Sequence, residues 1–172
     1  MAAPETHDMT AYGIPVTVRP LCAADHDRLA AAFRRMSDRS RHLRFLGPKP
    51  RLSRAELTYL ADVDQRSHAA FAAIDPDDGT IVGVARYAAE PALPGTADVA
   101  MFVVDAWQGQ GIATLLGRRL VQHADAQGVA RLVGSTFAEN RPARAVLRRL
   151  GFATTSIGGG VVELERSAPR AG

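Results

Sequence analysis

Residues 103–113, Val-Val-Asp-Ala-Trp-Gln-Gly-Gln-Gly-Ile-Ala, constrain the fold of this chain more than any other segment. They run from a strand pattern through a Gly-rich turn into a helix pattern, in which apolar residues recur at helical spacing until Gly128 ends the helix. Such a turn leaves backbone N–H groups unpaired at the positive end of the helix dipole. The segment therefore predicts a phosphate-binding site at the start of this helix.

Two well-known nucleotide-binding loops do not fit this turn. A Walker A loop ends in Gly-Lys-Ser/Thr, and the turn contains no lysine. A dinucleotide-binding fingerprint has Gly or Ala at the position where this chain has Thr114. An ordinary strand-to-helix connection with turn glycines is the alternative interpretation.

The hydrophobic periodicity switches between strand and helix patterns in a mixed order. Asp25 can cap a helix, and Ser53-x-x-Glu56 has the form of a capping box that opens another. This order predicts a mixed α/β domain rather than a doubly wound one. The expected strands are residues 16–19, 69–74, 81–89, 96–104, 132–137, 152–157 and 161–164, and the expected helices are residues 25–36, 37–45, 53–63, 111–127 and 142–150.

Length and composition fit one domain. The chain has 172 residues, of which 47% are hydrophobic and 23% charged. We expect a flexible arm at residues 1–13, the domain at residues 14–166 and a tail at residues 167–172. No apolar run approaches the length of a membrane span, and the N-terminus lacks the apolar core of a secretory signal. A lone Cys22 fits a reducing compartment, so the expected location is the cytoplasm.

The charge balance permits an anionic partner without indicating nucleic acid. The sequence pI is about 9.6, and every Lys or Arg except Lys49 is an arginine. These arginines are spread along the chain in ones and twos, without an aromatic RNA-binding pattern, a zinc-ligand set or a basic tail. We therefore expect neither a nucleic-acid partner nor a metal.

Residues 108–113 (Gln-Gly-Gln-Gly-Ile-Ala) form one motif, and residues 139–143 (Glu-Asn-Arg-Pro-Ala) with 150–152 (Leu-Gly-Phe) form a second. They resemble the Gln/Arg-x-x-Gly-x-Gly/Ala motif and the Asn-x-x-Ala…Gly-Phe segment of the GNAT superfamily, the acyl-CoA-dependent N-acyltransferases. The resemblance covers about residues 14–166. It implies a GNAT-like α/β (α+β) fold, with a central, mostly antiparallel, twisted sheet of about six to seven strands flanked by helices.

The resemblance also implies acetyl-CoA as the co-substrate. Backbone amides of the turn then bind the pyrophosphate of coenzyme A, and the preceding strand pairs through its main chain with the pantetheine arm. One strand amide lies near the thioester carbonyl and stabilises the tetrahedral oxyanion. Asn140 hydrogen-bonds the cofactor, caps the next helix, or does both. The implied cofactor-binding residues are Met101, Phe102, Val103, Gln108, Gly109, Gln110, Gly111, Ile112, Ala113, Thr114 and Asn140.

One position departs from the family pattern. Many members of the superfamily place a tyrosine, acting as general acid, four residues before the glycine of Gly-Phe, and this chain has Leu147 there. Leucine cannot protonate a thiolate. The acid role is therefore either unfilled or taken by water.

Three segments, residues 40–48, 82–87 and 130–134, narrow the resemblance to the acetyltransferase domain of bacterial protein lysine acetyltransferases. Those enzymes modify acyl-CoA synthetases and other proteins, and use a glutamate ten residues before the first motif as general base. Asp98 stands at that position, so the resemblance implies that it is the catalytic base, acting through a bridging water. The alternative is a surface strand residue, with Glu90 as reserve base.

The function expected from these observations is acetyl-CoA-dependent N-acetyl transfer to a primary amine by direct attack in a ternary complex. A protein lysine is the expected acceptor, with acyl-CoA synthetases as candidate partners. The oligomeric state stays open, with a homodimer as one candidate. Two alternatives stay open. One is a small-molecule amine acceptor, and the other is a non-catalytic acyl-CoA-binding module, which the missing tyrosine motivates.

Overall fold

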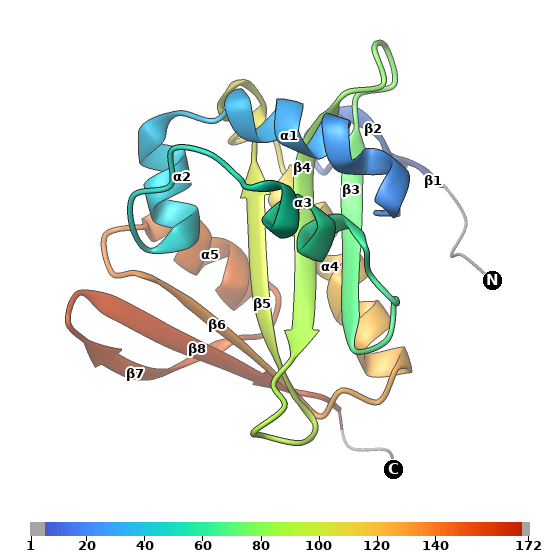
Figure 1. Ribbon diagram of the computed structural model, residues 1–172. Helices are drawn as coiled ribbons and strands as arrows, with labels where there is room; N and C mark the ends of the chain where they lie inside the picture. Colours follow the sequence, from blue (N-terminus) through green and yellow to red (C-terminus); the bar gives the residue numbers. More distant parts are fainter. Residues whose placement is uncertain (1–5, 170–172) are drawn as a thin grey trace.

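One mixed sheet of eight strands forms the centre of this computed structural model, which describes residues 6–169 (Figure 1). The strand order is β1-β2-β3-β4-β5-β6-β8-β7, and every neighbouring pair is antiparallel except β5 and β6. The mixed, mostly antiparallel sheet confirms the expected fold class, with one strand more than expected. The strands are β1 (Thr6–Met9), β2 (Pro15–Pro20), β3 (His68–Ile74), β4 (Ile81–Ala89), β5 (Thr96–Val103), β6 (Arg131–Phe137), β7 (Ala153–Gly158) and β8 (Val161–Ser167).

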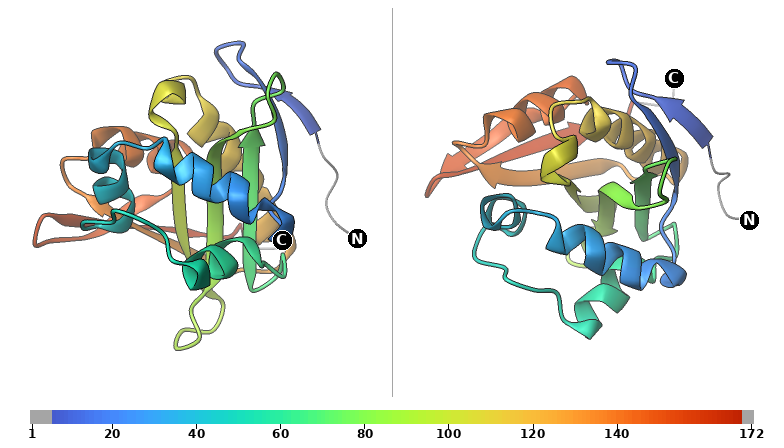
Figure 2. Two further views of the ribbon diagram at one scale, coloured as in Figure 1. Left: turned by 45° about the horizontal axis from the view of Figure 1, so that its top comes forward. Right: turned by 90° about the horizontal axis from the view of Figure 1, so that it is seen from above.

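Helices cover both faces of this sheet. Figure 2 shows α1, α2 and α3 on one face and α4 and α5 on the other. Buried side chains fill the two layers between sheet and helices, so the sheet has a core on each side. The helices are α1 (His26–Arg34), α2 (Asp38–Phe45), α3 (Arg54–Ala61), α4 (Ile112–Ala126) and α5 (Arg141–Arg149). None of the helices within residues 6–169 is long and apolar enough to cross a membrane.

Two of the local capping signals had different outcomes. The Ser53–Glu56 capping box at the start of α3 is confirmed, with Ser53 Oγ accepting the Glu56 N–H at 3.2 Å. The expectation that Asp25 caps α1 with its side chain is wrong. Its buried carboxylate instead accepts two hydrogen bonds from Arg19 in β2, at 2.6 and 2.7 Å. An ion pair that joins β2 to the start of α1 has replaced the local cap.

The N-terminal segment corrects a second expectation. Within the arm expected at residues 1–13, residues 6–9 form β1, which pairs antiparallel with β2. Arg119 of α4 donates from Nη2 to Thr6 Oγ1 at 2.8 Å. The rest of the expected arm, residues 1–5, lies outside the described residues, as do residues 170–172 of the expected tail. β1 was not expected because an edge strand buries little, so its sequence carries no apolar alternation.

Candidate active site

β5 and β6 diverge in the middle of the sheet (Figure 1). Their parallel ladder ends at the pair Val99↔Gly134, whereas β5 continues to Val103 and β6 to Phe137. Each strand keeps its antiparallel partner on the outer side over this stretch. A gap therefore opens beside residues 100–103, where β5 has no neighbour on one edge.

The main chain of β5 presents alternate residues to this gap. The Val104 N–H donates to the Val82 carbonyl of β4 at 2.9 Å. Because main-chain groups alternate in direction along a strand, those of Phe102 also face β4, and those of Met101 and Val103 face the gap. Phe102 lines the cavity, but its main-chain groups face β4 rather than the gap.

The Gly-rich turn follows directly at the end of β5. Gly109 and Gly111 have φ angles of +73° and +84°, a region that favours glycine. Leu115 N–H makes the first helical bond, to Gly111 O at 3.1 Å, and no side chain caps α4. The helix therefore begins with three N–H groups that have no acceptor within it and lie at its positive end. They belong to Ile112, Ala113 and Thr114.

The turn between β1 and β2 packs against this loop. A Cβ placed on Gly111 would lie 3.1 Å from Tyr12 Cδ2 and 3.3 Å from Thr10 Cβ. Thr10 Oγ1 accepts the N–H groups of Tyr12 and Ile14, both at 3.3 Å, which fixes the turn. Tyr12 keeps 66% of its surface exposed and lines the site. No pattern in the sequence indicates this role, because Tyr12 lies in the segment expected to be flexible.

A cavity of about 610 Å³ joins the gap and the turn. All the expected cofactor-binding residues line it except Gln110, whose Nε2 instead donates to the Ala106 carbonyl at 3.2 Å. Asn140 is the N-cap of α5, and its Oδ1 accepts the Ala143 N–H at 3.3 Å. Asn140 therefore caps its helix and lines the cavity at the same time.

Polar contacts tie the turn to α2. Gln108 Nε2 donates to the Val103 carbonyl at 3.0 Å and to Ser40 Oγ at 3.2 Å. Asp105 accepts hydrogen bonds from Ser37 N–H at 2.9 Å, Ser37 Oγ at 2.7 Å and Ser40 Oγ at 3.0 Å. Burial raises the pKa of Asp105, but these hydrogen bonds outweigh it and hold that pKa below its ordinary value. Gln108, the first residue of the first motif, thus links the end of β5 to α2 at the wall of the cavity.

Asp98 stands one residue before the β5–β6 ladder ends. Strand alternation places its side chain on the same face as that of Phe102, toward α1, α2 and α3. Asp98 is exposed and does not line the cavity itself. Burial and the negative charges of Glu90 and Glu163 raise its pKa, while Arg86 lowers it, and the net shift is upward.

The position of the family tyrosine is apolar in this chain. Leu147 of α5 is buried and faces Gly134 of β6, where a Cβ would lie 3.5 Å from Leu147 Cδ1. Hydroxyl groups near this part of the cavity come instead from Ser135 and Thr136 of β6. Leu147 therefore packs the wall of the cavity and supplies no proton.

Contacts between α2 and the end of β6 join the two sides of the site. The His42 ring stacks on Phe137 with centroids 5.0 Å apart. Arg39 Nη2 lies 4.0 Å from Glu139 Oε1. Arg39 and Glu139 line the cavity, whereas His42 and Phe137 do not.

A family model described as an acetyltransferase (GNAT) domain matches residues 16–153. The chain belongs to the GNAT acetyltransferase family. The match begins in β2, spans the β5–β6 gap, the turn and α5, and ends in β7, so it includes every residue that lines the cavity except Tyr12.

Two kinds of relative support the GNAT assignment. An acetyltransferase of Pseudomonas aeruginosa is 37% identical over 114 residues, which cover 65% of this chain and 61% of that protein. The GNAT domain of S. lividans PAT has a TM-score of 0.87 at 28% identity, covering 95% of this chain and 96% of that one. A cAMP-binding acyltransferase from Mycobacterium smegmatis has a TM-score of 0.70 at 25% identity, covering 97% and 48%. The alignment thus spans less than two thirds of the Pseudomonas protein.

Acetyl-CoA is the co-substrate of GNAT acetyltransferases. The site fits its two ends: three free N–H groups at a helix start suit a pyrophosphate, and the unpaired edge of β5 suits an arm that carries amides. Among residues 6–169 there is no group of three or more His, Cys, Asp or Glu side chains that could hold a metal.

Proposed function

We propose that this GNAT domain acetylates a primary amine and that the amine is a lysine side chain of a protein. Three segments that resemble bacterial protein lysine acetyltransferases support this acceptor, and so does the fold match to the GNAT domain of S. lividans PAT. Acyl-CoA synthetases are the candidate acceptors that the resemblance suggests.

The observation that carries the proposal is the break in the β5–β6 ladder beside the α4 N-terminus. When bound, acetyl-CoA supplies an acetyl thioester whose sulfur is the leaving group. Met101 and Val103 hold the arm through the N–H and C=O groups that face the gap, and an N–H in this stretch can donate to the acyl oxygen. The N–H groups at the start of α4 hold the pyrophosphate.

Asp98 is the proposed base. A lysine ammonium has an ordinary pKa of about 10.4, so a proton must leave before the nitrogen can attack. Asp98 lies at the narrow end of the gap but outside the cavity, which favours proton transfer through one water. Its raised pKa makes it a stronger base than an ordinary aspartate.

The experiment follows thiol release from acetyl-CoA with lysine peptides and purified acyl-CoA synthetase as acceptors, for the wild-type chain and Asp98→Asn. Peptide-dependent release that falls at least about tenfold in the variant supports the proposal. Acetyl-CoA binding without release for any amine indicates the non-catalytic module, which Leu147 would suit. Release with small amines but no protein acceptor indicates the alternative substrate class.

We also propose a cellular location and an assembly for the enzyme. The single cysteine, Cys22, suits a reducing compartment, so we place the enzyme in the cytoplasm. We also propose a homodimer, which light scattering on the purified chain tests by its molecular mass.

A further inference from the structure

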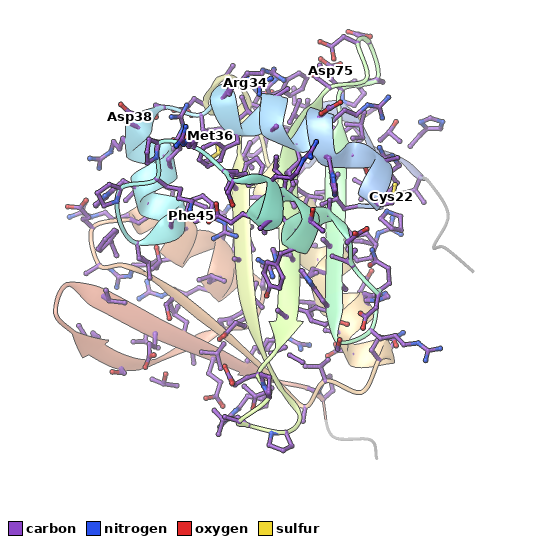
Figure 3. All side chains as sticks on the ribbon, in the orientation of Figure 1. Cys22, Arg34, Met36, Asp38, Phe45 and Asp75 are labelled. Carbon is purple, nitrogen blue, oxygen red and sulfur yellow. The ribbon has the colours of Figure 1, made fainter. Side chains whose placement is uncertain are left out.

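Arg44 of α2 is a cation without a counter-ion. Its Nε is buried and has no hydrogen-bond partner. Within residues 6–169 no carboxylate lies at ion-pair distance from it. Its Cζ lies 4.7 Å from the ring centroid of Phe45. Figure 3 labels Phe45 at the end of α2. Arg44 as a whole is partly buried, but its Nε–H lacks an acceptor at a buried position, which costs free energy that an anionic ligand would offset.

Arg86 of β4 is a second cation on the same side of the sheet. Its Nε donates to His68 Nε2 at 3.0 Å, and its Cζ lies 4.8 Å from the Tyr59 ring centroid. Burial and the charge of Arg86 together lower the pKa of His68 to about 4, so this partner is neutral at pH 7. These two contacts of Arg86 hold it in place and are uncharged, and the nearby carboxylate whose pKa it lowers is that of Asp98.

The positive charges of Arg44 and Arg86 repel each other. Burial, followed by the charge of Arg86, lowers the pKa of Arg44 to about 10. Arg44 therefore stays protonated at pH 7 despite its surroundings. A carboxylate that approaches the pair gains from both charges.

A shared wall connects the pocket that holds this pair to the large cavity. Arg44 and Arg86 line a second, small pocket of about 20 Å³, whose other lining residues are apolar. Arg44, Ala100 and Phe102 line both this pocket and the large cavity. Arg44 therefore forms part of the wall that the two cavities share.

The charged side chains near Asp98 and near Ala100 of β5 have opposite signs. Asp98, with Glu90 and Glu163 near it, makes one end negative. Ala100 lies two residues further on the same face, about 7 Å along the strand, at the wall that Arg44 forms. An acceptor with an ammonium and a carboxylate a few ångströms apart matches this arrangement.

We propose that Arg44 and Arg86 bind a carboxylate of the acceptor, so that the preferred acceptor is an amine with a carboxylate close to it. The guanidinium fork of Arg44 suits a carboxylate, and the phosphates of coenzyme A are bound at the far end of β5 by the turn. The carboxylate can belong to an acidic residue next to the target lysine or to a free amino acid. This inference rests on the proposed function, because it names the acceptor that the same site selects.

The first test compares acceptors on the wild-type chain. Lysine peptides with Glu beside the lysine are paired with matched Gln peptides, and free lysine is paired with lysinamide, with thiol release as readout. We expect kcat/KM to be at least about tenfold higher for the carboxylate member of one pair. The pair that shows it identifies the source of the carboxylate. Equal rates in both pairs overturn the proposal.

The second test uses variants of Arg44. Arg44→Gln removes the charge. It is expected to bring the ratio of kcat/KM between the carboxylate acceptor and its neutral partner close to one, mainly through a higher KM for the carboxylate acceptor. Arg44→Lys keeps the charge without the planar fork and is expected to give an intermediate ratio. Arg118→Gln, at an exposed position of α4 that lines neither cavity, is the matched control and keeps the full ratio. A full ratio in Arg44→Gln contradicts the proposal.

A binding measurement separates this inference from the proposed function. Glutarate, a dicarboxylate without an amine, is titrated into the wild-type chain while the Arg44 Nε–H resonance is followed by NMR. We expect a saturable shift that Arg118→Gln keeps, and we expect glutarate binding, measured by calorimetry, to be retained in Arg118→Gln and lost in Arg44→Gln. If no amine supports thiol release, the proposed function fails while glutarate binding still reports on the site. If glutarate leaves the resonance unchanged, the carboxylate site is refuted even in an active acetyltransferase.

Discussion

Asp105 accepts hydrogen bonds from both the N–H and the hydroxyl of Ser37, at 2.9 and 2.7 Å, and so joins the end of the β5 segment to the start of α2. Ser37 is also the N-cap of α2, where its Oγ accepts the Ser40 N–H at 3.1 Å. One carboxylate thus fixes the helix that carries Arg44 relative to the turn that follows β5.

Replacing this carboxylate tests the connection. Asp105→Asn is expected to lower the free energy of unfolding at pH 7 by about 1 kcal/mol, because charge-assisted hydrogen bonds are weakened at a solvent-exposed site. Asp38→Asn, in α2 with a fully exposed side chain, is the control. It is expected to change the free energy of unfolding by less than about 0.5 kcal/mol. Chemical denaturation of the three proteins measures the difference.

The same variant has a defined pH dependence. The folded pKa of Asp105 lies below its ordinary value, so its contribution is present above the unfolded pKa and is lost as pH falls through the folded pKa. The stability difference between wild type and Asp105→Asn should therefore shrink in acid. A difference that persists unchanged below both pKa values would contradict this origin.

Gly111→Ala tests the packing of the β1–β2 turn on the turn before α4. Alanine at φ +84° is strained by about 1–2 kcal/mol, and its Cβ would also press on Tyr12. We expect lower thermal stability and an acetyl-CoA Kd about tenfold higher, since the free N–H groups of α4 shift. Gly109→Ala, with a similar φ and open space around its Cβ, is the matched control. Equal losses in both variants would show that Tyr12 is irrelevant.

Glu163→Gln tests the electrostatics of the proposed base. The Glu163 carboxylate raises the pKa of Asp98, so its removal should lower that pKa. The base is active when deprotonated, and the acid limb of kcat/KM against pH should therefore move to lower pH. Glu165→Gln, two residues along β8, is expected to leave the limb in place. If the acid limb of Glu163→Gln does not move, the ionisation of Asp98 does not control kcat/KM.

His68→Gln tests the neutral partner of Arg86. The folded pKa of His68 is about 4, below its ordinary 6.5, so the unfolded chain takes up a proton first as pH falls. The contribution of His68 is therefore full above pH 6.5 and declines between 6.5 and 4. Glutamine keeps an acceptor for Arg86 but does not titrate, and we expect a shallower fall in Tm over this interval. A slope equal to that of the wild type would count against the assignment.

The parts of the site that lie within one short segment could be predicted from the sequence. The turn, the start of α4 and the capping box at Ser53 depend on neighbouring residues, and glycine positions report backbone conformation directly. Gln110 is the exception, because the direction of its side chain depends on its contact with Ala106.

The parts that depend on packing between distant segments were missed. β1 is a polar edge strand, so nothing in residues 6–9 distinguishes it from a loop. Asp25 has the position of a cap, but Arg19 in another element offers a stronger partner. Arg44 stands in a chain where nearly every basic residue is arginine, so only the packing of α2 on the sheet reveals that its Nε is isolated.

The gap beside Met101 and Val103 also bears on solubility. An unpaired strand edge is a template for pairing with another chain, and proteins that expose one aggregate unless it is guarded. Here the free edge lies in the interior of a sheet, between strands that hold both sides, and it opens into a cavity of about 610 Å³. A slender ligand can enter, whereas the strand of a second protein would have to bring its own sheet with it. The shape that admits a substrate arm is therefore also the protection against self-association through that edge.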